Sequence, residues 1–223
     1  MSCRRQRVFV NANTRLVTPA LVPEMRLHLA DEALPIWQKT EKELGGLNLP
    51  PPYWAFAWPG SQALARYVLD NRRIVVGKAV LDLGSGSGLA AIAACTAGAL
   101  SVLAADTDPW AIVAVEMNAA ANGLRVTTTS ADLLAAAPPN IDVVLVGDLF
   151  YERALAERVL AFVERANAGG AQVLIGDPER SYFPRGRFRK LADYAVPVTR
   201  ELEDAEIKPT AVWQLAEPVC ADH

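Results

Sequence analysis

The chain has few of the residues that build metal sites and disulfide frameworks. Its 223 residues include only two histidines, His28 and His223, and its three cysteines form no Cys-x-x-Cys pair. Zinc sites and disulfide scaffolds need several such side chains at close spacing. The sequence therefore argues against a metal site, a disulfide framework and a histidine-based catalytic triad, and it fits a reducing compartment.

The chain also lacks a long apolar segment and an excess of positive charge. Its longest apolar stretch, residues 89–100, is much shorter than the roughly 20 residues that a membrane-spanning helix needs. No apolar run follows Arg4 and Arg5, as an export signal would require. A formal net charge of −3 argues against binding to nucleic acid or to an anionic membrane. We expect a cytoplasmic protein that binds neither.

The composition is that of a globular protein, with 52% hydrophobic and 21% charged residues. Its first part, residues 1–77, is irregular. Residues 8–10 and 15–17 predict short edge strands, and residues 25–44 show a loose helical spacing that Pro35 interrupts. We treat this part as an N-terminal extension.

Prolines and aromatic residues gather at residues 49–60 and predict an extended segment rather than a helix. Ser61 is a candidate N-cap for a helix over residues 62–71. Aromatic side chains at every second position, as here, more often form a buried strand than a binding site. We expect both roles, with some rings packed inward while Trp54 or Trp58 borders the binding site.

From residue 78 the chain alternates between strand-like and helix-like segments. Apolar or β-branched runs predict strands at residues 79–83, 102–105, 125–129, 141–146 and 171–175. Segments with helical start and stop signals separate them, at residues 89–97, 109–122 and 152–168. This alternation predicts an α/β fold with a doubly wound parallel sheet. Two further strand-like runs, 194–200 and 210–215, have no predicted helix between them and are expected to pair antiparallel at the sheet edge.

The first predicted strand ends in a glycine-rich loop, Asp82-Leu83-Gly84-Ser85-Gly86-Ser87-Gly88. In open α/β sheets ligands bind beyond such strand ends. A dinucleotide fingerprint would need a third glycine where Leu89 stands. An acid followed by Gly-x-Gly-x-Gly instead resembles the S-adenosylmethionine motif of the seven-strand methyltransferases. There the loop cradles the cationic amino-acid end of the cofactor, which the Asp82 carboxylate suits.

Carboxylates also follow the next two predicted strands. Asp106 stands where an acid about 20 residues after the glycine loop binds the ribose hydroxyls of a nucleotide. Asp108 precedes Pro109 and is expected to cap a helix. Asp132 is placed either to accept a hydrogen bond from an adenine amino group or to cap a helix.

The fourth predicted strand ends in Gly147-Asp148-Leu149-Phe150-Tyr151. This run resembles the acid-x-x-aromatic motif of a group of protein-lysine methyltransferases. DNA adenine methyltransferases carry Asp or Asn, two prolines and Tyr or Phe at this place. Pro51-Pro52-Tyr53 imitates that pattern, but it follows another proline and lies on a different segment, so we set a DNA substrate aside.

Six motifs stand in one order along the chain: Pro52-Tyr53-Trp54-Ala55, Trp58-Pro59-Gly60, Gln62-Ala63-Leu64, the Asp82 loop, Gly147-Asp148 with Phe150-Tyr151, and Gly176-Asp177-Pro178 followed by Arg180. Together they resemble the electron transfer flavoprotein β-subunit lysine methyltransferases, a family of class I S-adenosylmethionine-dependent methyltransferases. The likeness runs from about Phe9 to Trp213, and Ser61 departs from a second glycine that the family has. It implies a Rossmann-like seven-stranded sheet of order 3-2-1-4-5-7-6 with an antiparallel last pair.

The resemblance further implies a methyltransferase domain over residues 78–223, with S-adenosylmethionine as cofactor and lysines of the electron transfer flavoprotein β subunit as substrate. The residues expected to bind the cofactor are Trp58, Gly60, Asp82, Gly84, Ser85, Gly86, Asp106, Thr107 and Asp132. Asp148 and Tyr151 are expected to be catalytic, and Trp54 and Phe150 to contact the lysine. One alternative is a different substrate, either another protein such as a ribosomal one or a small molecule. A binding module without activity is the other, and the intact Asp148 motif argues against it.

Lysine chemistry adds one requirement. Only a neutral amine can attack a sulfonium methyl group. For a lysine with a pKa of about 10.4, deprotonation at pH 7 costs roughly 4.6 kcal/mol. Channel walls formed by Trp54, Phe150 and Tyr151 would lower this pKa by desolvation. Asp148 would not, because a carboxylate stabilises ammonium. We expect Asp148 to orient the amine and to stabilise the positive charge that grows on nitrogen.

A cluster of basic residues lies near the end of the chain, made of Arg180, Arg185, Arg187, Arg189 and Lys190. It is interpreted either as a solvated face or as a docking surface for an acidic protein.

Overall fold

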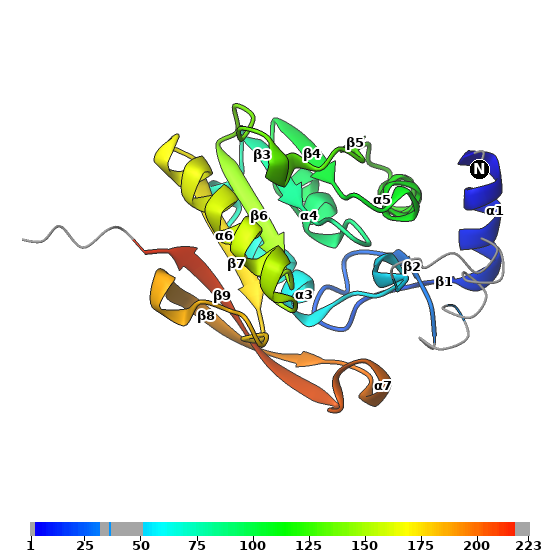
Figure 1. Cartoon of the computed structure of the whole chain (residues 1–223). Helices are drawn as coiled ribbons and strands as arrows, with labels where there is room; N and C mark the ends of the chain where they lie inside the picture. The colour runs from blue at the N-terminus through cyan, green and yellow to red at the C-terminus, as the bar shows by residue number, and fades with distance from the viewer. Residues whose placement is uncertain (1–2, 32–35, 37–50, 217–223) are drawn as a thin grey trace, which may run out of the picture.

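A seven-stranded sheet forms the centre of the computed structural model, which describes residues 3–31, 36 and 51–216 (Figure 1). Its strands are β3 Ala79–Leu83, β4 Ser101–Ala105, β5 Thr127–Thr129, β6 Val143–Gly147, β7 Gln172–Asp177, β8 Phe188–Pro197 and β9 Ile207–Leu215. They lie in the order β5-β4-β3-β6-β7-β9-β8. The first five are parallel, and β9 pairs antiparallel with both β7 and β8. Counted from β3, this is the order 3-2-1-4-5-7-6, which confirms the predicted fold.

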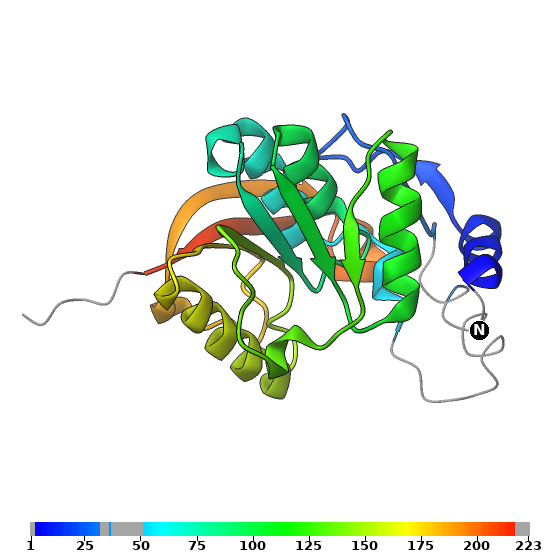
Figure 2. The ribbon, with the colours of Figure 1, turned by 90° about the horizontal axis from the view of Figure 1, so that it is seen from above.

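Helices cover both faces of the sheet. The helices α3 Pro59–Asp70, α4 Leu89–Ala97 and α5 Pro109–Ala121 pack on one face, and α6 Arg153–Ala168 packs on the other. Figure 2 shows α6 on the opposite side of the sheet from α4. Alternate residues of β6 face the two layers, because Val144 lies in the cluster with α6 and Leu145 in the cluster with α3 and α4. All of β6 is buried, as expected for a central parallel strand.

Local signals explain where the helices of the sheet domain begin and end. Pro109 occupies the first turn of α5, and the Asp108 carboxylate accepts a hydrogen bond from Trp110 N at 2.8 Å, which confirms the predicted cap. Gly123, with φ of +69°, follows the end of α5. In contrast, α3 begins at Pro59, two residues before the predicted Ser61 cap. Pro59 occupies the first helical position and favours a helix start there. Ser61 lies in the first turn, where its backbone N–H donates to Asp148 Oδ2.

Of the two short strands predicted near the N-terminus, one is wrong and one is confirmed. Residues 8–10 belong to the helix α1 Cys3–Asn13, and Phe9 packs against Trp110 of α5 with ring centroids 4.9 Å apart. Three apolar residues are too short a run to distinguish a strand from one buried helix face. Residues 15–17 form the strand β1 Arg15–Val17, as predicted, and it pairs with β2 Leu27–Leu29.

The helical spacing predicted over residues 25–44 is wrong at β2, and residues 32–35 and 37–50 lie outside the described part. Nearer the site, Tyr53–Ala55 forms the single 3₁₀ turn η1 within the segment predicted to be extended. Three further 3₁₀ turns are η2 Arg72–Ile74, η3 Leu133–Ala135 and η4 Arg185–Arg187. The division at residue 77 stays a prediction, and α3, which precedes it, packs on β7 and β9.

The antiparallel edge pair is confirmed with different bounds. The strands β8 and β9 begin earlier than the predicted runs, and the short helix α7 Arg200–Glu203 lies between them at the tip of the hairpin (Figure 1). The first residues of β8 include arginine and lysine, which are common on edge strands but also typical of loops. The start of this strand was therefore not predicted from the sequence. In residues 3–31, 36 and 51–216, the structure has no helix with the length and apolar character of a membrane span.

Candidate active site

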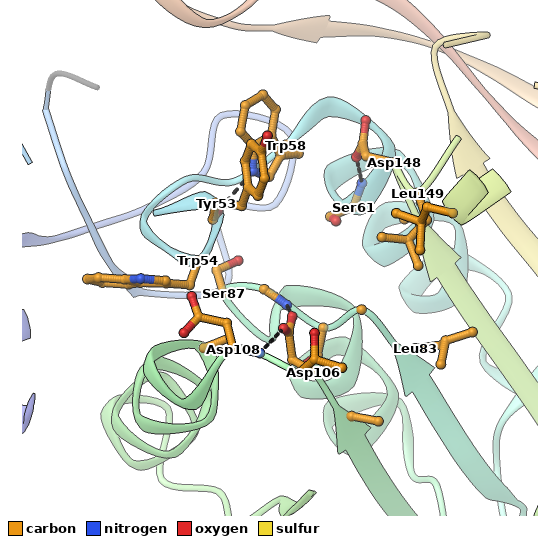
Figure 3. A pocket seen from close by; sticks show the side chains of 18 of the residues that line it. Tyr53, Trp54, Trp58, Ser61, Leu83, Ser87, Asp106, Asp108, Asp148 and Leu149 are labelled. Carbon is orange, nitrogen blue, oxygen red and sulfur yellow. Dashed lines mark hydrogen bonds between the residues drawn. The ribbon is translucent and has the colours of Figure 1, made fainter. Parts of the chain in front are cut away.

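A cavity of about 1060 Å³ opens beyond the carboxyl ends of β3, β4 and β6. Its walls include most of the predicted site residues: Trp54, Trp58, Gly84, Ser85, Gly86, Asp106, Thr107, Asp132, Asp148 and Tyr151. Figure 3 shows Asp148 and Ser61 across the cavity from Asp106 and Asp108. Ligand pockets for single small molecules span roughly 300–1,000 Å³, so this cavity has room for a nucleotide-sized ligand and a second group. Three predicted residues, Gly60, Asp82 and Phe150, are not on its walls.

The glycine loop presents an open backbone and a hydroxyl without a partner. Gly86 has φ of +51°, and a Cβ built there would meet nothing within 4 Å, so a ligand can approach this backbone closely. Ser85 is buried on the cavity wall, and its Oγ has no hydrogen-bond partner in the structure. Buried hydroxyls are normally paired, so this one is available to a ligand atom.

Backbone N–H groups of two loops, after β3 and after β4, hold the Asp106 carboxylate in place. Its Oδ2 accepts a hydrogen bond from Gly86 N and its Oδ1 from Asp108 N, both at 2.9 Å (Figure 3). Burial raises the pKa of this carboxyl. Each oxygen keeps a second lone pair, so Asp106 can accept from two hydroxyls. Its predicted contact with a ribose stays a prediction, now with suitable geometry.

Asp82 lies beneath the loop instead of on the cavity wall. Its Oδ2 accepts a hydrogen bond from Ala91 N at 2.9 Å, and burial raises its pKa to about 7. The N-cap residue of α4 is Gly88, which has no side chain to offer. Asp82 therefore caps α4 from β3, and the cofactor contact expected from the sequence stays a prediction.

Asp132 takes one of the two roles left open by the sequence, that of a cap. Its Oδ1 accepts from Leu134 N at 3.1 Å and so caps η3, while Oδ2 accepts from Arg158 Nη2 at 2.5 Å. The residue also lines the cavity. The cap is thus observed, and the contact with an adenine amino group stays a prediction.

Asp148 follows β6 in a left-handed conformation, with φ of +58°. Its N–H donates to Gly176 O at 3.0 Å, its Oδ2 accepts from Ser61 N at 3.0 Å, and its Oδ1 accepts from Arg180 Nη2 at 2.8 Å. Burial raises the pKa of Asp148 to about 6, although Arg180 lowers it. Non-glycine residues in this backbone region are uncommon and cluster at functional sites.

Gly60 allows α3 to reach this carboxylate. A Cβ at Gly60 would stand 2.1 Å from Gly176 O and 2.6 Å from Asp148 Oδ2. A side chain at this position would therefore push the helix away from β7. The structure assigns Gly60 to this close contact rather than to the cavity wall.

The aromatic segment divides between core and cavity. Trp54 is 1% exposed and stacks on Trp110, yet one edge lines the cavity and its Nε1 has no partner. The ring of Tyr53 lies 5.8 Å from that of Trp58 and 5.5 Å from that of Tyr151, and all three line the cavity. Burial raises the pKa of Tyr151 to about 12, so its phenol keeps its proton.

Phe150 lies in the core and not on the cavity wall, and its contact with the lysine stays a prediction. It is fully buried, and its ring packs edge-on against Phe183 at 5.4 Å and against Phe188 at 6.0 Å. Of the aromatic pair, only Tyr151 lines the cavity. The pattern alone does not show which of the two faces outward.

Arg180 is the site residue that the sequence analysis missed. It lines the cavity, forms salt bridges with Asp148 at 2.8 Å and Glu203 at 2.6 Å, and lies over the Trp58 ring at 5.5 Å. The other basic residues of its cluster have nearby partners: Arg185 pairs with Glu179, Arg187 with Glu164, Lys190 with Asp193, and Arg189 donates to Gln214. The signal that could have set Arg180 apart was its place in the Gly176-Asp177-Pro178 motif rather than its charge.

The described residues hold no group of three or more His, Cys, Asp or Glu side chains that could bind a metal ion. A model of the ribosomal protein L11 methyltransferase (PrmA) family matches residues 62–169. Magnesium protoporphyrin IX methyltransferase from Synechocystis PCC 6803, solved with bound S-adenosylmethionine, shares the fold with a TM-score of 0.52. It is 16% identical, and the match covers 70% of this chain and 78% of that one. The sheet order is that of the Rossmann-like fold of the class I methyltransferases, and the cavity lies at its carboxyl edge.

Two curated relatives narrow this class. The electron transfer flavoprotein beta subunit lysine methyltransferase of Danio rerio is 38% identical over 213 residues, which cover 92% of this chain and 81% of that protein. Its counterpart in Rattus norvegicus is 36% identical over 216 residues, covering 94% and 84%. The chain belongs to the electron transfer flavoprotein β-subunit lysine methyltransferase family.

Proposed function

We propose that this chain transfers methyl groups from S-adenosylmethionine to lysine side chains of the electron transfer flavoprotein β subunit. The observation that carries the proposal is the Asp148 carboxylate, on the wall of a cavity lined by Tyr53, Trp58 and Tyr151. Aromatic walls suit a long unbranched amine, and a carboxylate offers an acceptor for its N–H groups. The family supports the same substrate, because both relatives are named for it.

The residues of the cavity fit the cofactor. Ser85 has an unpaired buried Oγ, Gly86 leaves its backbone open, and Asp106 holds two acceptor oxygens in place. These groups would hold the amino-acid and ribose parts, with Asp132 further along the wall. When bound, S-adenosylmethionine supplies an activated methyl group on a positively charged sulfur.

The residues of this chain prepare the amine. Asp148 accepts one N–H of the lysine and so directs the nitrogen lone pair, and its charge stabilises the positive charge that grows on nitrogen. Tyr151, which keeps its proton, borders the cavity together with Tyr53 and Trp58. Their rings exclude water from the lysine stem, which lowers the pKa of the ammonium by desolvation. The cytoplasmic location and the absence of nucleic-acid and membrane partners stay predictions from the sequence.

The substrate is tested by incubating the chain with purified electron transfer flavoprotein and methyl-labelled S-adenosylmethionine. Mass spectrometry should show methylated lysine on the β subunit. An unmodified β subunit, with label on a ribosomal protein or on a small molecule of a cell extract, would overturn the proposed substrate. The relation to the L11 methyltransferase family makes the ribosomal protein the first alternative to examine.

The role of Asp148 is tested with Asp148→Asn, which keeps the shape of the side chain. Turnover should fall far more than tenfold, whereas affinity for S-adenosylhomocysteine by calorimetry should stay within about threefold. A variant that kept a tenth of wild-type turnover would limit the contribution of the charge to about 1.4 kcal/mol. Asp193→Asn removes an exposed carboxylate on β8 and serves as the matched control.

A further inference from the structure

The Asp148 carboxylate is already paired with a cation. Arg180 Nη2 lies 2.8 Å from Asp148 Oδ1 and 2.6 Å from Glu203 Oε1. The exposed fractions are 18% for the Arg180 side chain, 8% for Asp148 and 2% for Glu203. Pairs this deeply buried are little screened by salt. Because Arg180 also lines the cavity, its charge acts where a substrate amine would approach.

Contacts with three residues, Glu203, Asp177 and Trp58, hold Arg180 in this position. Glu203, at the end of α7, accepts from Nη2 at 2.6 Å and from Nη1 at 3.3 Å. The backbone N–H of Arg180 donates to Asp177 Oδ1 at 2.7 Å, and the Trp58 ring lies beneath the guanidinium. A group held in this way keeps its place when a ligand enters the cavity.

The surrounding groups leave this cluster close to neutral. Lys208 of β9 lies 3.0 Å from Glu203 Oε2, so two cations face the carboxylates of Asp148 and Glu203. Asp177, at the end of β7, is buried, and burial and Asp148 raise its pKa to about 7. Around pH 7 these charges therefore nearly balance, and above pH 7 the ionised Asp177 carboxylate adds one negative charge.

Two phenols, Tyr53 and Tyr151, line the cavity near Asp148, and the wall also carries Asp106, Asp108, Asp132 and Arg158. Burial raises the pKa of Tyr53, and Arg180 lowers it. Burial raises the pKa of Tyr151, and Tyr53, Glu152 and Asp106 raise it further.

The sign of the effect on a substrate lysine follows. An unpaired carboxylate raises the pKa of a neighbouring lysine, because it favours the ammonium form. A nearby cation lowers that pKa, and lysine nucleophiles are activated in this way. Arg180 beside Asp148 therefore lowers the pKa that a substrate lysine would have next to Asp148 alone, and so favours the neutral amine.

We propose that Arg180 is a positioning residue that keeps the substrate lysine in its neutral form. The inference rests on the proposed function and deepens it. The guanidinium reduces the attraction of Asp148 for ammonium, while each Asp148 oxygen keeps a lone pair that can accept an N–H of the amine. The ammonium gives its proton to water before attack, so no other co-reactant is needed.

The test is the pH profile of kcat at saturating flavoprotein and cofactor. In Arg180→Gln the apparent pKa for activity should rise by about one unit or more. Turnover at pH 7 should then fall about tenfold or more and recover near pH 10. Arg180→Lys should return the midpoint towards that of the wild type, and Arg125→Gln, which changes an exposed arginine that does not line the cavity, should leave the profile unchanged. An equal loss of turnover at every pH would overturn the proposal, because it would indicate a structural role.

A second variant has the opposite expected sign. Glu203→Gln removes the negative charge that pairs with the guanidinium and keeps the guanidinium itself. The apparent pKa for activity should therefore fall below that of the wild type. A loss of packing cannot move the two midpoints in opposite directions. A rise or no change in Glu203→Gln would contradict the electrostatic role of Arg180.

A measurement without turnover separates this inference from the proposed function. The titration of ¹³C-labelled n-butylamine, a mimic of the lysine side chain, is followed by NMR in the presence of the chain and S-adenosylhomocysteine. The bound amine should have a lower pKa than the free amine in the wild type but not in Arg180→Gln. An equal or higher pKa in the wild type, or no uptake at any pH, would overturn the inference. An unlabelled flavoprotein would overturn only the proposed substrate.

Discussion

Asp82, Asp106 and Asp148 lie at or just beyond the ends of three parallel strands, and burial raises the pKa of each carboxyl. Their partners distinguish them. Asp82 accepts from the start of α4, Asp106 accepts from two backbone N–H groups of the cavity wall, and Asp148 pairs with Arg180. One residue type thus caps a helix in Asp82, holds two loops of the cavity wall in Asp106, and forms a buried ion pair on that wall in Asp148.

Replacing Asp106 by alanine should weaken binding of S-adenosylhomocysteine by about 1.5–3 kcal/mol, the contribution of hydrogen bonds to a charged acceptor. Titration calorimetry measures this loss directly, with Asp193→Ala as the control. Unchanged affinity in Asp106→Ala would remove this residue from the cofactor site.

Replacing Asp82 by asparagine should change how stability depends on pH. The pKa of Asp82 in the folded chain is about 7, against about 3.9 in an unfolded chain. Between these values the folded form holds a proton that the unfolded form has lost, so this group makes wild-type stability fall as pH rises from about 4 to 7. Asp82→Asn removes that dependence. Its free energy of unfolding relative to wild type should rise across the window by roughly 2 to 4 kcal/mol.

Urea unfolding at several pH values from 4 to 8 measures this difference. Any constant offset from the amide cancels, because only the trend with pH is compared. Asp193→Asn, which changes an exposed carboxyl, should show no such trend. A flat difference for Asp82→Asn would mean that Asp82 is ionised throughout the window.

At the scale of elements, two helices are capped from other parts of the fold. The N-cap residues of α3 and α4 are Trp58 and Gly88, and neither makes a side-chain cap. Asp148 accepts from the first turn of α3, and Asp82 accepts from the first turn of α4. A carboxylate at a helix N-terminus is stabilised by the unpaired N–H groups and the helix dipole. The start of α3 therefore holds the Asp148 side chain in position.

Gly60→Ala tests this contact between α3 and the sheet. The new Cβ would stand 2.1 Å from Gly176 O, a backbone atom that cannot move aside. The chain should lose about 2 kcal/mol or more of unfolding free energy and most of its activity. Gly186→Ala, where a Cβ meets nothing within 4 Å, should change stability by no more than about 0.5 kcal/mol. Wild-type stability and turnover in Gly60→Ala would show that α3 can shift without cost.

At the scale of the whole molecule, one cavity takes its walls from distant parts of the chain. Gln6 of α1 and Arg180 both line it, and Glu203, at the tip of the β8–β9 hairpin, holds Arg180 (Figure 1). A ligand in such a cavity contacts segments that separate on unfolding. Its binding free energy is therefore linked to the stability of the whole fold.

S-adenosylhomocysteine at one hundred times its Kd should raise the free energy of unfolding by about 2.7 kcal/mol. NAD at the same concentration should have no effect, because Leu89 stands where a dinucleotide fingerprint needs glycine. Thermal unfolding with each ligand makes the comparison. Equal stabilisation by NAD would contradict the assignment of the glycine loop.

The sequence by itself determined the sheet and the chemistry of its carboxyl edge. The strands β3, β4, β6 and β7 and the helices α4, α5 and α6 follow from local apolar periodicity and from caps such as Asp108 and Pro109. Such signals act between residues that are close in the chain, which is why they can be read there. The motifs around Gly84 and Asp148 likewise indicated the family.

Only the tertiary structure decided which residues face the cavity. Phe150 packs in the core, Asp82 accepts a hydrogen bond from α4, and Arg180 pairs with the Asp148 carboxylate. The sequence had placed Arg180 in a basic surface cluster. Each of these outcomes depends on partners more than eight positions away, such as Ala91, Phe183 or Glu203. Contacts of this range leave no periodic trace in the sequence, because burial and charge pairing are satisfied only when the layers of the fold come together.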